Sequence, residues 1–489
     1  MRAKFLGKFL ALAVLIGASL PMAASASIVA AAPGFAAPFV SIGPKAVRVN
    51  TSSPDQTLFT CQVGLIPGVV CYDPFQIRHA YHIDTLIDAG YTGAGRTIVI
   101  VDAFQSPTLP DDLDMFDSTY GLPDRSTFFT QVAPDGLTPF DPTDDNMVGW
   151  SSEITLDVEW AHAVAPDAHI ALVLAKSNDD ADILSATKFA VDHNLGDVIS
   201  QSFGENESCV DSDLLNAEHQ LFAKATLKRI TLLASSGDQG AAEQTCDGNS
   251  WVQAASSPAS DPLVTAVGGT ELHAADYCLT ALGCDPTVNP DPGTYQGEIA
   301  WNEFDSDNAS TGGGFSVLYR EPLYQFAAVH NRAKQRGVPD VSYNAAIYHG
   351  VLVFWDGDWW LFGGTSAGSP QWAGIVAIAD QKARQRLGFI NAALYLINLN
   401  AKKYAASFHD VTDGNNTVSE SDSDGNLVPV QGFDAGKGWD ATTGLGSPNV
   451  DQLVGALIKF KVADDFNGTI TGFDPFAHGH FSHHHSNPH

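Results

Sequence analysis

The sequence has few basic residues and few long apolar segments. It contains 25 Lys and Arg against 56 Asp and Glu, for a formal net charge of −31 at pH 7. Nucleic acids and anionic membrane surfaces are bound through basic patches, so this composition argues against both as partners. No segment is long enough in apolar residues to span a bilayer. These absences predict a protein that works outside the membrane, and we expect a monomer.

The one marked apolar run near the N-terminus is short. Basic residues at positions 2, 4 and 8 precede the run at 9–20, and small residues follow at 24–26. This order is typical of a signal peptide with its cleavage site. Residues 1–26 are therefore predicted to be removed, and the mature protein is predicted to be secreted.

Cysteine is also scarce, with six residues and no Cys-x-x-Cys pair. The missing pair argues against a zinc site of that type. An even number of cysteines in an exported chain predicts disulfides instead, although six cysteines allow fifteen pairings. Pairing of nearest neighbours gives Cys61–Cys71, Cys209–Cys246 and Cys278–Cys284. The second of these would hold the loop that follows Asp238.

Apolar runs alternate with segments that read as helices. A buried strand is expected at 97–101, ending at Asp102, and helices are expected, for example, at 181–193 and 214–228. Further strands are expected at 170–174, 198–202, 230–234 and 264–267. Such alternation predicts an α/β protein with a mainly parallel sheet covered by helices on both faces.

A glycine-rich segment, Gly-Gly-Thr-Ser-Ala-Gly-Ser-Pro at 363–370, precedes a predicted helix at 372–387. Glycines let the backbone turn tightly and approach a substrate closely. Ser366 would lie beside free N–H groups at a helix N-terminus, which can hold a developing oxyanion. The segment therefore makes Ser366 a candidate nucleophile, and the alternative is a serine that only caps the helix.

Three acidic residues lie in contexts that suit catalysis. Glu153 and Asp157 are four residues apart, so they share one face of a predicted helix. Two carboxylates this close repel each other unless they share a proton and titrate as a unit. Asp238 follows a buried strand in the loop Ala-Ser-Ser-Gly-Asp-Gln-Gly-Ala at 234–241, a usual place for a catalytic side chain.

These segments, in this order, resemble the sedolisin family of serine-carboxyl peptidases. The resemblance runs from about Tyr72 to about Leu457, and the stretches at 198–204, 264–270, 312–316 and 338–342 also match the family pattern. It implies a subtilisin-like fold, a Ser-Glu-Asp triad, activity in acid, and protein or peptide substrates. None of the 16 histidines lies in the His-Gly-Thr segment of ordinary subtilases, which argues against that alternative.

The resemblance also implies a role for each site residue. Ser366 would attack the peptide carbonyl, Glu153 would take the serine proton, and Asp157 would hold and tune Glu153. Asp238 would stand at the oxyanion, where it must be protonated to donate a hydrogen bond. Gln239 replaces the serine that usually follows this aspartate. Asp102 is interpreted as structural or supporting, because the second acid of the family lies on the helix.

The C-terminal part matches the calcium-binding segments of the family at 408–415 and 435–440. The match implies one Ca²⁺, held by the side chains of Asp410 and Asp440 and by the carbonyl oxygens of Val411, Gly436 and Gly438. Calcium takes about six to eight oxygen ligands of these kinds. The alternative is that the two aspartates only cap turns.

The sequence predicts four parts: a signal peptide (1–26), a short leader (27–71), a peptidase domain with its calcium site (72–460) and a His-rich, disordered tail (461–489). The tail holds six histidines, and transition-metal binding is the alternative for it. Relatives usually carry a long prosegment, for which too few residues precede position 72. This departure keeps open a second function, a catalytically silent, calcium-stabilised secreted binding protein on the same fold.

Overall fold

The computed structural model describes residues 28–29, 45–49, 58–280, 284–285 and 287–460. The predicted signal peptide, parts of the predicted leader and the predicted tail lie outside the described residues.

A central sheet of eight strands organises the described part of the chain. All but one of its strands run parallel, and β14 (Tyr295–Ala300) pairs antiparallel with β13. The parallel strands follow one another across the sheet in the order β17 (Val341–Asn344), β13 (Thr265–Ala274), β9 (Thr231–Ser235), β7 (Val198–Gln201), β4 (Thr97–Ala103), β6 (His169–Ala175) and β5 (Phe129–Val132). The predicted α/β class with a mainly parallel sheet is confirmed.

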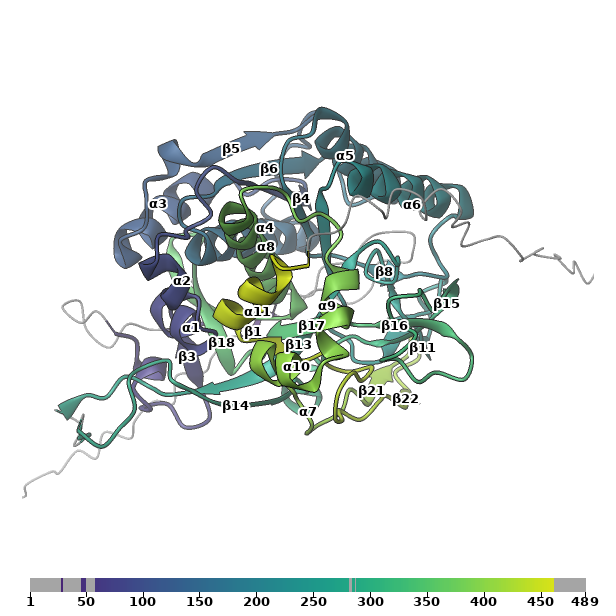
Figure 1. Ribbon diagram of the computed structural model, residues 1–489. Coiled ribbons are helices and arrows are strands. Elements are labelled where there is room, and N and C mark those ends of the chain that lie inside the picture. The colour runs from purple at the N-terminus through teal and green to yellow at the C-terminus, as the bar shows by residue number, and fades with distance from the viewer. Residues whose placement is uncertain (1–27, 30–44, 50–57, 281–283, 286, 461–489) are drawn as a thin grey trace, which may run out of the picture.

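Helices cover both faces of this sheet. Helices α4 (Asp145–Val164) and α8 (Thr365–Ala383) pack together on one face, and α5 (Asp180–His193) and α6 (Ser212–Leu227) cover the other. In Figure 1, α5 and α6 lie in the upper part of the view, while α4 and α8 lie in its centre. Smaller helices complete the fold at α1 (Pro74–Ala80), α2 (Asp84–Asp88), α3 (Leu109–Tyr120), α7 (Phe304–Asp307), α9 (Asn391–Asn398), α10 (Ala401–Ser407) and α11 (Val450–Leu457).

The central strands carry mainly apolar residues, and β4 shows why, because it faces two cores. Ile98 and Ile100 of β4 enter the core shared with α4 and α8. Val99 and Val101 enter the core shared with α5 and α6. Successive side chains of a strand point to opposite faces, so a strand covered on both sides shows no polar alternation. This explains why the strands read in the sequence as continuous apolar runs.

A second sheet of five strands packs against the core that contains α4 and α8, and one of its strands leads into α8. Its order is β1 (Ile28–Val29), β2 (Lys45–Arg48), β19 (Asp358–Gly363), β18 (His349–Trp355) and β3 (Val70–Tyr72). Strand β19 ends at Gly363, and Gly364 precedes α8 with φ +108°, a conformation that L side chains rarely adopt. The last residue of β19 is therefore the first glycine of the turn that precedes Ser366.

Helix α8 begins earlier than the sequence predicts, at Thr365 rather than near Trp372. Ser366 is therefore the second residue of the helix and does not precede it. Pro370 is accommodated within the helix. Because proline has no N–H, the Ser366 carbonyl lacks its usual partner in the next turn. That carbonyl instead accepts a long hydrogen bond of 3.5 Å from the Ser202 hydroxyl.

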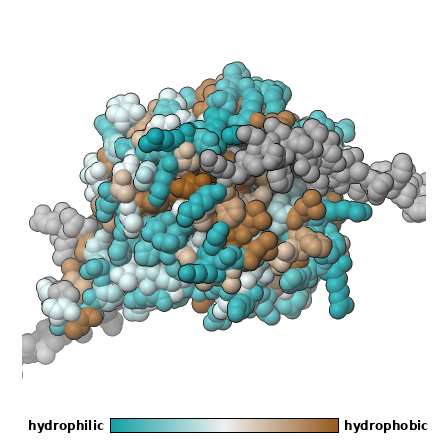
Figure 2. Space-filling view, in the orientation of Figure 1, coloured by the Kyte–Doolittle hydropathy of each residue, from teal (hydrophilic) through white to brown (hydrophobic). Residues whose placement is uncertain are grey.

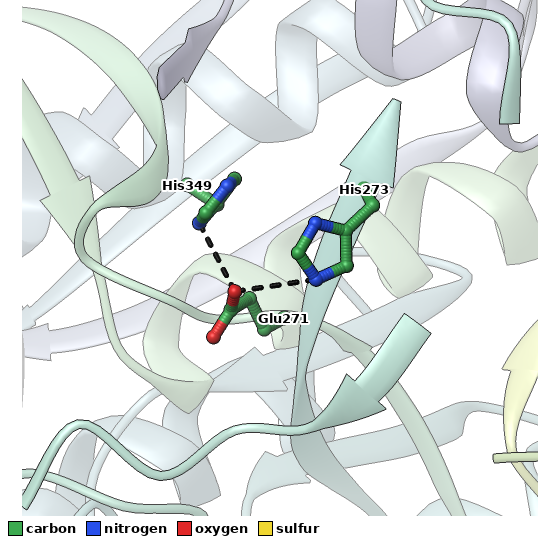
Figure 3. Close-up of side chains that lie close together, drawn as sticks. All are labelled: Glu271, His273 and His349. Atoms are coloured by element: carbon green, nitrogen blue, oxygen red, sulfur yellow. Dashed lines mark ion pairs between the residues drawn. The ribbon is translucent and has the colours of Figure 1, made fainter. Parts of the chain in front are cut away.

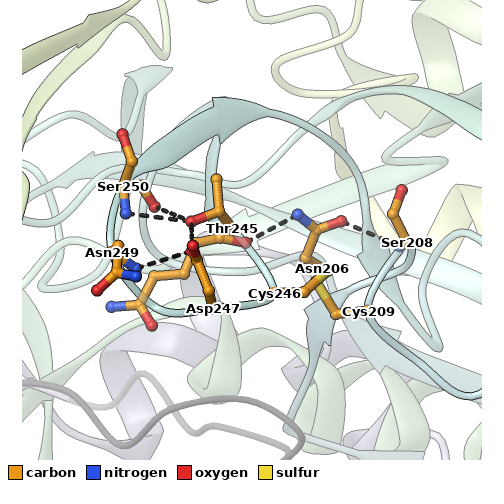
Figure 4. The surroundings of a disulfide bond; sticks show 9 residues. Asn206, Ser208, Cys209, Thr245, Cys246, Asp247, Asn249 and Ser250 are labelled. Carbon is orange, nitrogen blue, oxygen red and sulfur yellow. Dashed lines mark hydrogen bonds between the residues drawn. A yellow bond between two sulfur atoms is a disulfide. The ribbon is translucent and has the colours of Figure 1, made fainter. Parts of the chain in front are cut away.

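Three disulfides join Cys61 to Cys71, Cys209 to Cys246 and Cys278 to Cys284, so the nearest-neighbour pairing is confirmed. The bond at Cys246 fixes the far end of the loop that starts at Asp238 (Figure 4). Beside it, the Asn206 amide donates to the Gln244 carbonyl at 2.8 Å. The loop is therefore anchored both covalently and by hydrogen bonds.

Within the described residues, no helix combines the length and apolarity needed to cross a membrane. On the face shown in Figure 2, hydrophilic residues occupy most of the area, and hydrophobic residues form separate smaller patches.

Candidate active site

Ser366 lies in the first turn of α8, at the junction between β19 and the helix. Its side chain is almost fully enclosed, with 1% of the residue exposed. The Oγ atom donates a long hydrogen bond of 3.4 Å to the Ser202 carbonyl. A hydroxyl held this loosely keeps its freedom to turn toward another acceptor.

Glu153 and Asp157 lie on α4, and their helix is buried on all sides from Trp150 to Val164. Neither carboxyl group is exposed. Burial and the nearby charges of Asp157 and Asp102 raise the pKa of Glu153 well above its usual range, while interaction with the Ser366 hydroxyl opposes the rise. The predicted pair therefore shares one helix face and lies beside the predicted nucleophile.

Asp157 is hydrogen-bonded to Ser202, the residue after β7, and lies near Asp102 of β4. Its Oδ2 accepts a hydrogen bond of 2.7 Å from the Ser202 hydroxyl. Burial raises the pKa of Asp157, and hydrogen bonds from Ser202 and with Glu153 oppose the rise. Burial and the Asp157 charge raise the pKa of Asp102, at the end of β4. Three carboxyl groups thus form one buried cluster in which full ionisation is disfavoured.

Asp238 lies in the loop after β9 and reaches the start of α8. Its Oδ1 atom accepts two hydrogen bonds from Thr365, one from the backbone N–H at 2.8 Å and one from the hydroxyl at 2.7 Å. Gly237, with φ +108°, makes the preceding turn. These contacts fix the Asp238 carboxyl group next to Ser366.

Ser366 and Asp238 line the same pocket. Other groups around it include Ser202, Gly204, Gly237 and Glu243. Burial raises the pKa of Glu243 to about 8, while a hydrogen bond with Ser256 opposes the rise. A carbonyl group entering this pocket would meet the serine hydroxyl and the Asp238 carboxyl together.

Sequence reasoning did not identify Ser202, Thr365 or Glu243 as parts of the site. Ser202 lies within the stretch 198–204 that matches the family pattern, and Thr365 is adjacent to the predicted nucleophile. The sequence therefore indicated where Ser202 and Thr365 lie, but it did not indicate which residues they contact. No motif around Glu243 indicates a role in the site, because it reaches the pocket only through the folded path of the 238–246 loop.

The two segments that hold the predicted calcium-ligating residues are joined by hydrogen bonds in the C-terminal part. The Gly438 N–H donates to Asp410 Oδ1 at 2.9 Å, and the Gly436 N–H donates to Asp440 Oδ2 at 3.0 Å. Among the described residues, no hydrogen bond reaches the carbonyl oxygens of Val411, Gly436 or Gly438. Two carboxylates with nearby carbonyl oxygens left free are the donor set that Ca²⁺ prefers, so these residues fit the ion.

The comparisons with known proteins agree with this geometry. No protein-family model matches the chain. Kumamolisin from Bacillus sp. (strain MN-32) is 32% identical over 395 residues, which cover 79% of this chain and 64% of kumamolisin. Sedolisin from Pseudomonas sp. (strain 101) is 31% identical over 383 residues, which cover 76% of this chain and 59% of sedolisin.

A solved structure of Pseudomonas sedolisin, a serine-carboxyl proteinase complexed with two molecules of pseudo-iodotyrostatin, matches the fold. Its TM-score is 0.66 at 29% identity, over 80% of this chain and 99% of that chain. The chain belongs to the sedolisin family. It is homologous to serine-carboxyl peptidases over most of its length, and it spans less than two thirds of the length of kumamolisin or sedolisin.

Proposed function

We propose that this sedolisin homologue is a secreted serine-carboxyl endopeptidase that hydrolyses peptide bonds in acid. The observation that carries the proposal is the meeting of Ser366, Glu153, Asp157 and Asp238 around one buried site. These residues come from α8, α4 and the loop after β9, so only the complete fold assembles them. Homology to serine-carboxyl peptidases supports the same reaction.

In the proposed reaction, Ser366 Oγ attacks the peptide carbonyl and Glu153 takes the hydroxyl proton. The amine leaves with a proton, and water then hydrolyses the acyl-enzyme on Ser366. Asp157 holds Glu153 by a hydrogen bond, and the two carboxyls share a proton in acid because two buried carboxyls cannot both ionise without cost. The raised pKa of Glu153 makes its ionised form a stronger base than an exposed carboxylate.

Protonated Asp238 would donate a hydrogen bond to the oxyanion that forms on the substrate. Two hydrogen bonds from Thr365 to its Oδ1 atom hold the carboxyl group next to Ser366, where the oxyanion would form. An ionised Asp238 would repel the oxyanion, so activity should fall toward neutral pH. The N–H of Ser366 at the start of α8 would supply a second donor.

We also propose one Ca²⁺ held by Asp410 and Asp440 with the carbonyls of Val411, Gly436 and Gly438. When bound, the ion would supply stability by joining the segments at 410–411 and 436–440. The signal peptide (1–26), the leader (27–71), the peptidase domain (72–460) and the tail (461–489) remain our proposal for the organisation of the chain. Protein or peptide substrates and a monomeric state belong to the same proposal.

The test is hydrolysis of a denatured protein substrate by purified wild type, in acid and at neutral pH. Ser366→Ala and Glu153→Gln should each abolish turnover while circular dichroism remains unchanged. Ser369→Ala is the matched control. Ser369 lies one turn further along α8, and its hydroxyl is hydrogen-bonded to the Ser200 hydroxyl at 2.8 Å and not to the proposed catalytic residues. Normal hydrolysis by folded Ser366→Ala would reject the nucleophile. A folded wild type that is inactive at every pH would favour the silent binding protein.

A further inference from the structure

A cluster of one carboxylate and two imidazoles lies apart from the residues described above. Glu271 and His273 are two residues apart on β13, so their side chains leave the same face of the strand. His349 is the first residue of β18. Figure 3 shows the three side chains turned toward one another from these two strands. The cluster therefore bridges the central sheet and the second sheet.

The spacing of the ligand atoms in this cluster suits a tetrahedral metal ion. Glu271 Oε1 lies 3.3 Å from His273 Nε2 and 3.2 Å from His349 Nδ1. One ligand atom from each residue lies within 4.8 Å of the other two. Metal–ligand bonds of about 2.0–2.1 Å in tetrahedral geometry place neighbouring ligand atoms about 3.3 Å apart. The two separations from Glu271 Oε1 match this value.

We propose that Glu271, His273 and His349 bind one divalent transition-metal ion, with Zn²⁺ as the preferred ion. Two imidazole nitrogens and one carboxylate oxygen form a ligand set typical of zinc. Calcium prefers oxygen ligands, so this site is chemically distinct from the one proposed at Asp410 and Asp440. The proposal does not depend on peptidase activity.

The surroundings leave room for a further ligand. The His273 side chain is 42% exposed, whereas those of Glu271 and His349 are 17% and 19% exposed. The two rings lie at 62° with centroids 4.9 Å apart, so they do not stack face to face. A metal ion held by the three residues would keep one side open to water. It would also tie β13 to β18 in the folded protein alone, which stabilises the fold by mass action.

The experiment must separate this site from the six histidines at 478–489, which can bind metals by themselves. All proteins are therefore full-length, with these six histidines replaced by serine. Zn²⁺ is titrated by calorimetry at neutral pH with excess Ca²⁺ present, and Co²⁺ is added separately to record its visible spectrum. The parent should bind one Zn²⁺ and give the strong absorption of tetrahedral Co²⁺.

His349→Ala and Glu271→Gln should each weaken Zn²⁺ binding by more than about a hundredfold, since loss of a group that merely orients a ligand costs about 10- to 100-fold. His273→Gln, at the most exposed position, repeats the test with the least effect on folding. His79→Ala is the matched control, because His79 also pairs with an acidic residue, Asp84, but lies outside the cluster. A parent that binds no Zn²⁺, or a folded His349→Ala protein that binds it as tightly as the parent, would overturn the proposal.

Discussion

Replacing Asp380 by asparagine should reduce the loss of folding stability that occurs as the pH rises from acid toward neutral. Asp380 lies on α8 with none of its surface exposed, and its Oδ1 accepts the Leu387 N–H at 2.7 Å. Burial raises the pKa of Asp380 from 3.8 to about 8, while the Leu387 hydrogen bond opposes the rise. Asparagine keeps the size and the acceptor of the protonated acid but cannot ionise.

The sign of the effect follows from this raised pKa. The folded state holds its proton more tightly than the unfolded chain does, so folding is favoured most when Asp380 is protonated in both states. This contribution is complete below the unfolded pKa near 3.8 and is lost as the pH rises through about 8. One pKa unit corresponds to about 1.4 kcal/mol, so between about pH 4 and about pH 8 the wild type should lose about 5 kcal/mol that the asparagine variant keeps.

Urea unfolding at about pH 4 and about pH 8 measures this difference, with both proteins in a Ser366→Ala background to prevent autolysis. The free energy of unfolding of Asp380→Asn should fall less between these pH values than that of the parent. Asp424→Asn serves as the control, because Asp424 is exposed. Parallel losses of stability in the parent and in Asp380→Asn would refute the reasoning.

Two further predictions concern Asp238 and the calcium ligands. In Asp238→Asn, Oδ1 can still accept from Thr365 and the amide can still donate, so a pH–rate profile should decline less steeply toward neutrality. Asp238→Ala should lose about a hundred- to a thousandfold in rate, and an asparagine variant as inactive as the alanine variant at every pH would contradict the oxyanion role. Chelation should lower the melting temperature of the wild type, since calcium at a hundredfold excess over its dissociation constant adds about 2.7 kcal/mol. Asp410→Ala should have a lower melting temperature that no longer responds to calcium, and an unchanged wild-type midpoint after chelation would reject the site.

The central sheet could be predicted because its strands are apolar on both faces. The expected strand at 97–101 became β4, Thr97–Ala103, and the other four expected strands also exist. Strand β5 was not predicted, because it is a short edge strand without a buried apolar run. The hairpin of β18 and β19 was also missed, although its turn at Asp356 and Gly357, both with positive φ, is an Asp-Gly pair typical of hairpins.

The candidate site was predictable where its geometry is local. The spacing of Glu153 and Asp157 was enough to place both on one helix face, and α4 confirms that placement. The contact between Ser202 and Asp157 spans 45 residues, and the contact between Thr365 and Asp238 spans 127. Such contacts depend on how strands and helices pack, and no spacing in the sequence encodes them. The catalytic and calcium-binding roles of the residues remain predictions.

The pairing of β2 with β19 has a practical consequence for handling the protein. Trp360 to Gly363, the residues just before the turn that carries Ser366, pair with Lys45 to Arg48. A recombinant form starting at Tyr72 would lack β2. The backbone groups of β19 that pair with β2 would then be exposed and could pair with another chain. This form would also remove both Cys61 and Cys71, and with them their disulfide. An expression boundary upstream of Lys45 preserves both the covered edge and the disulfide.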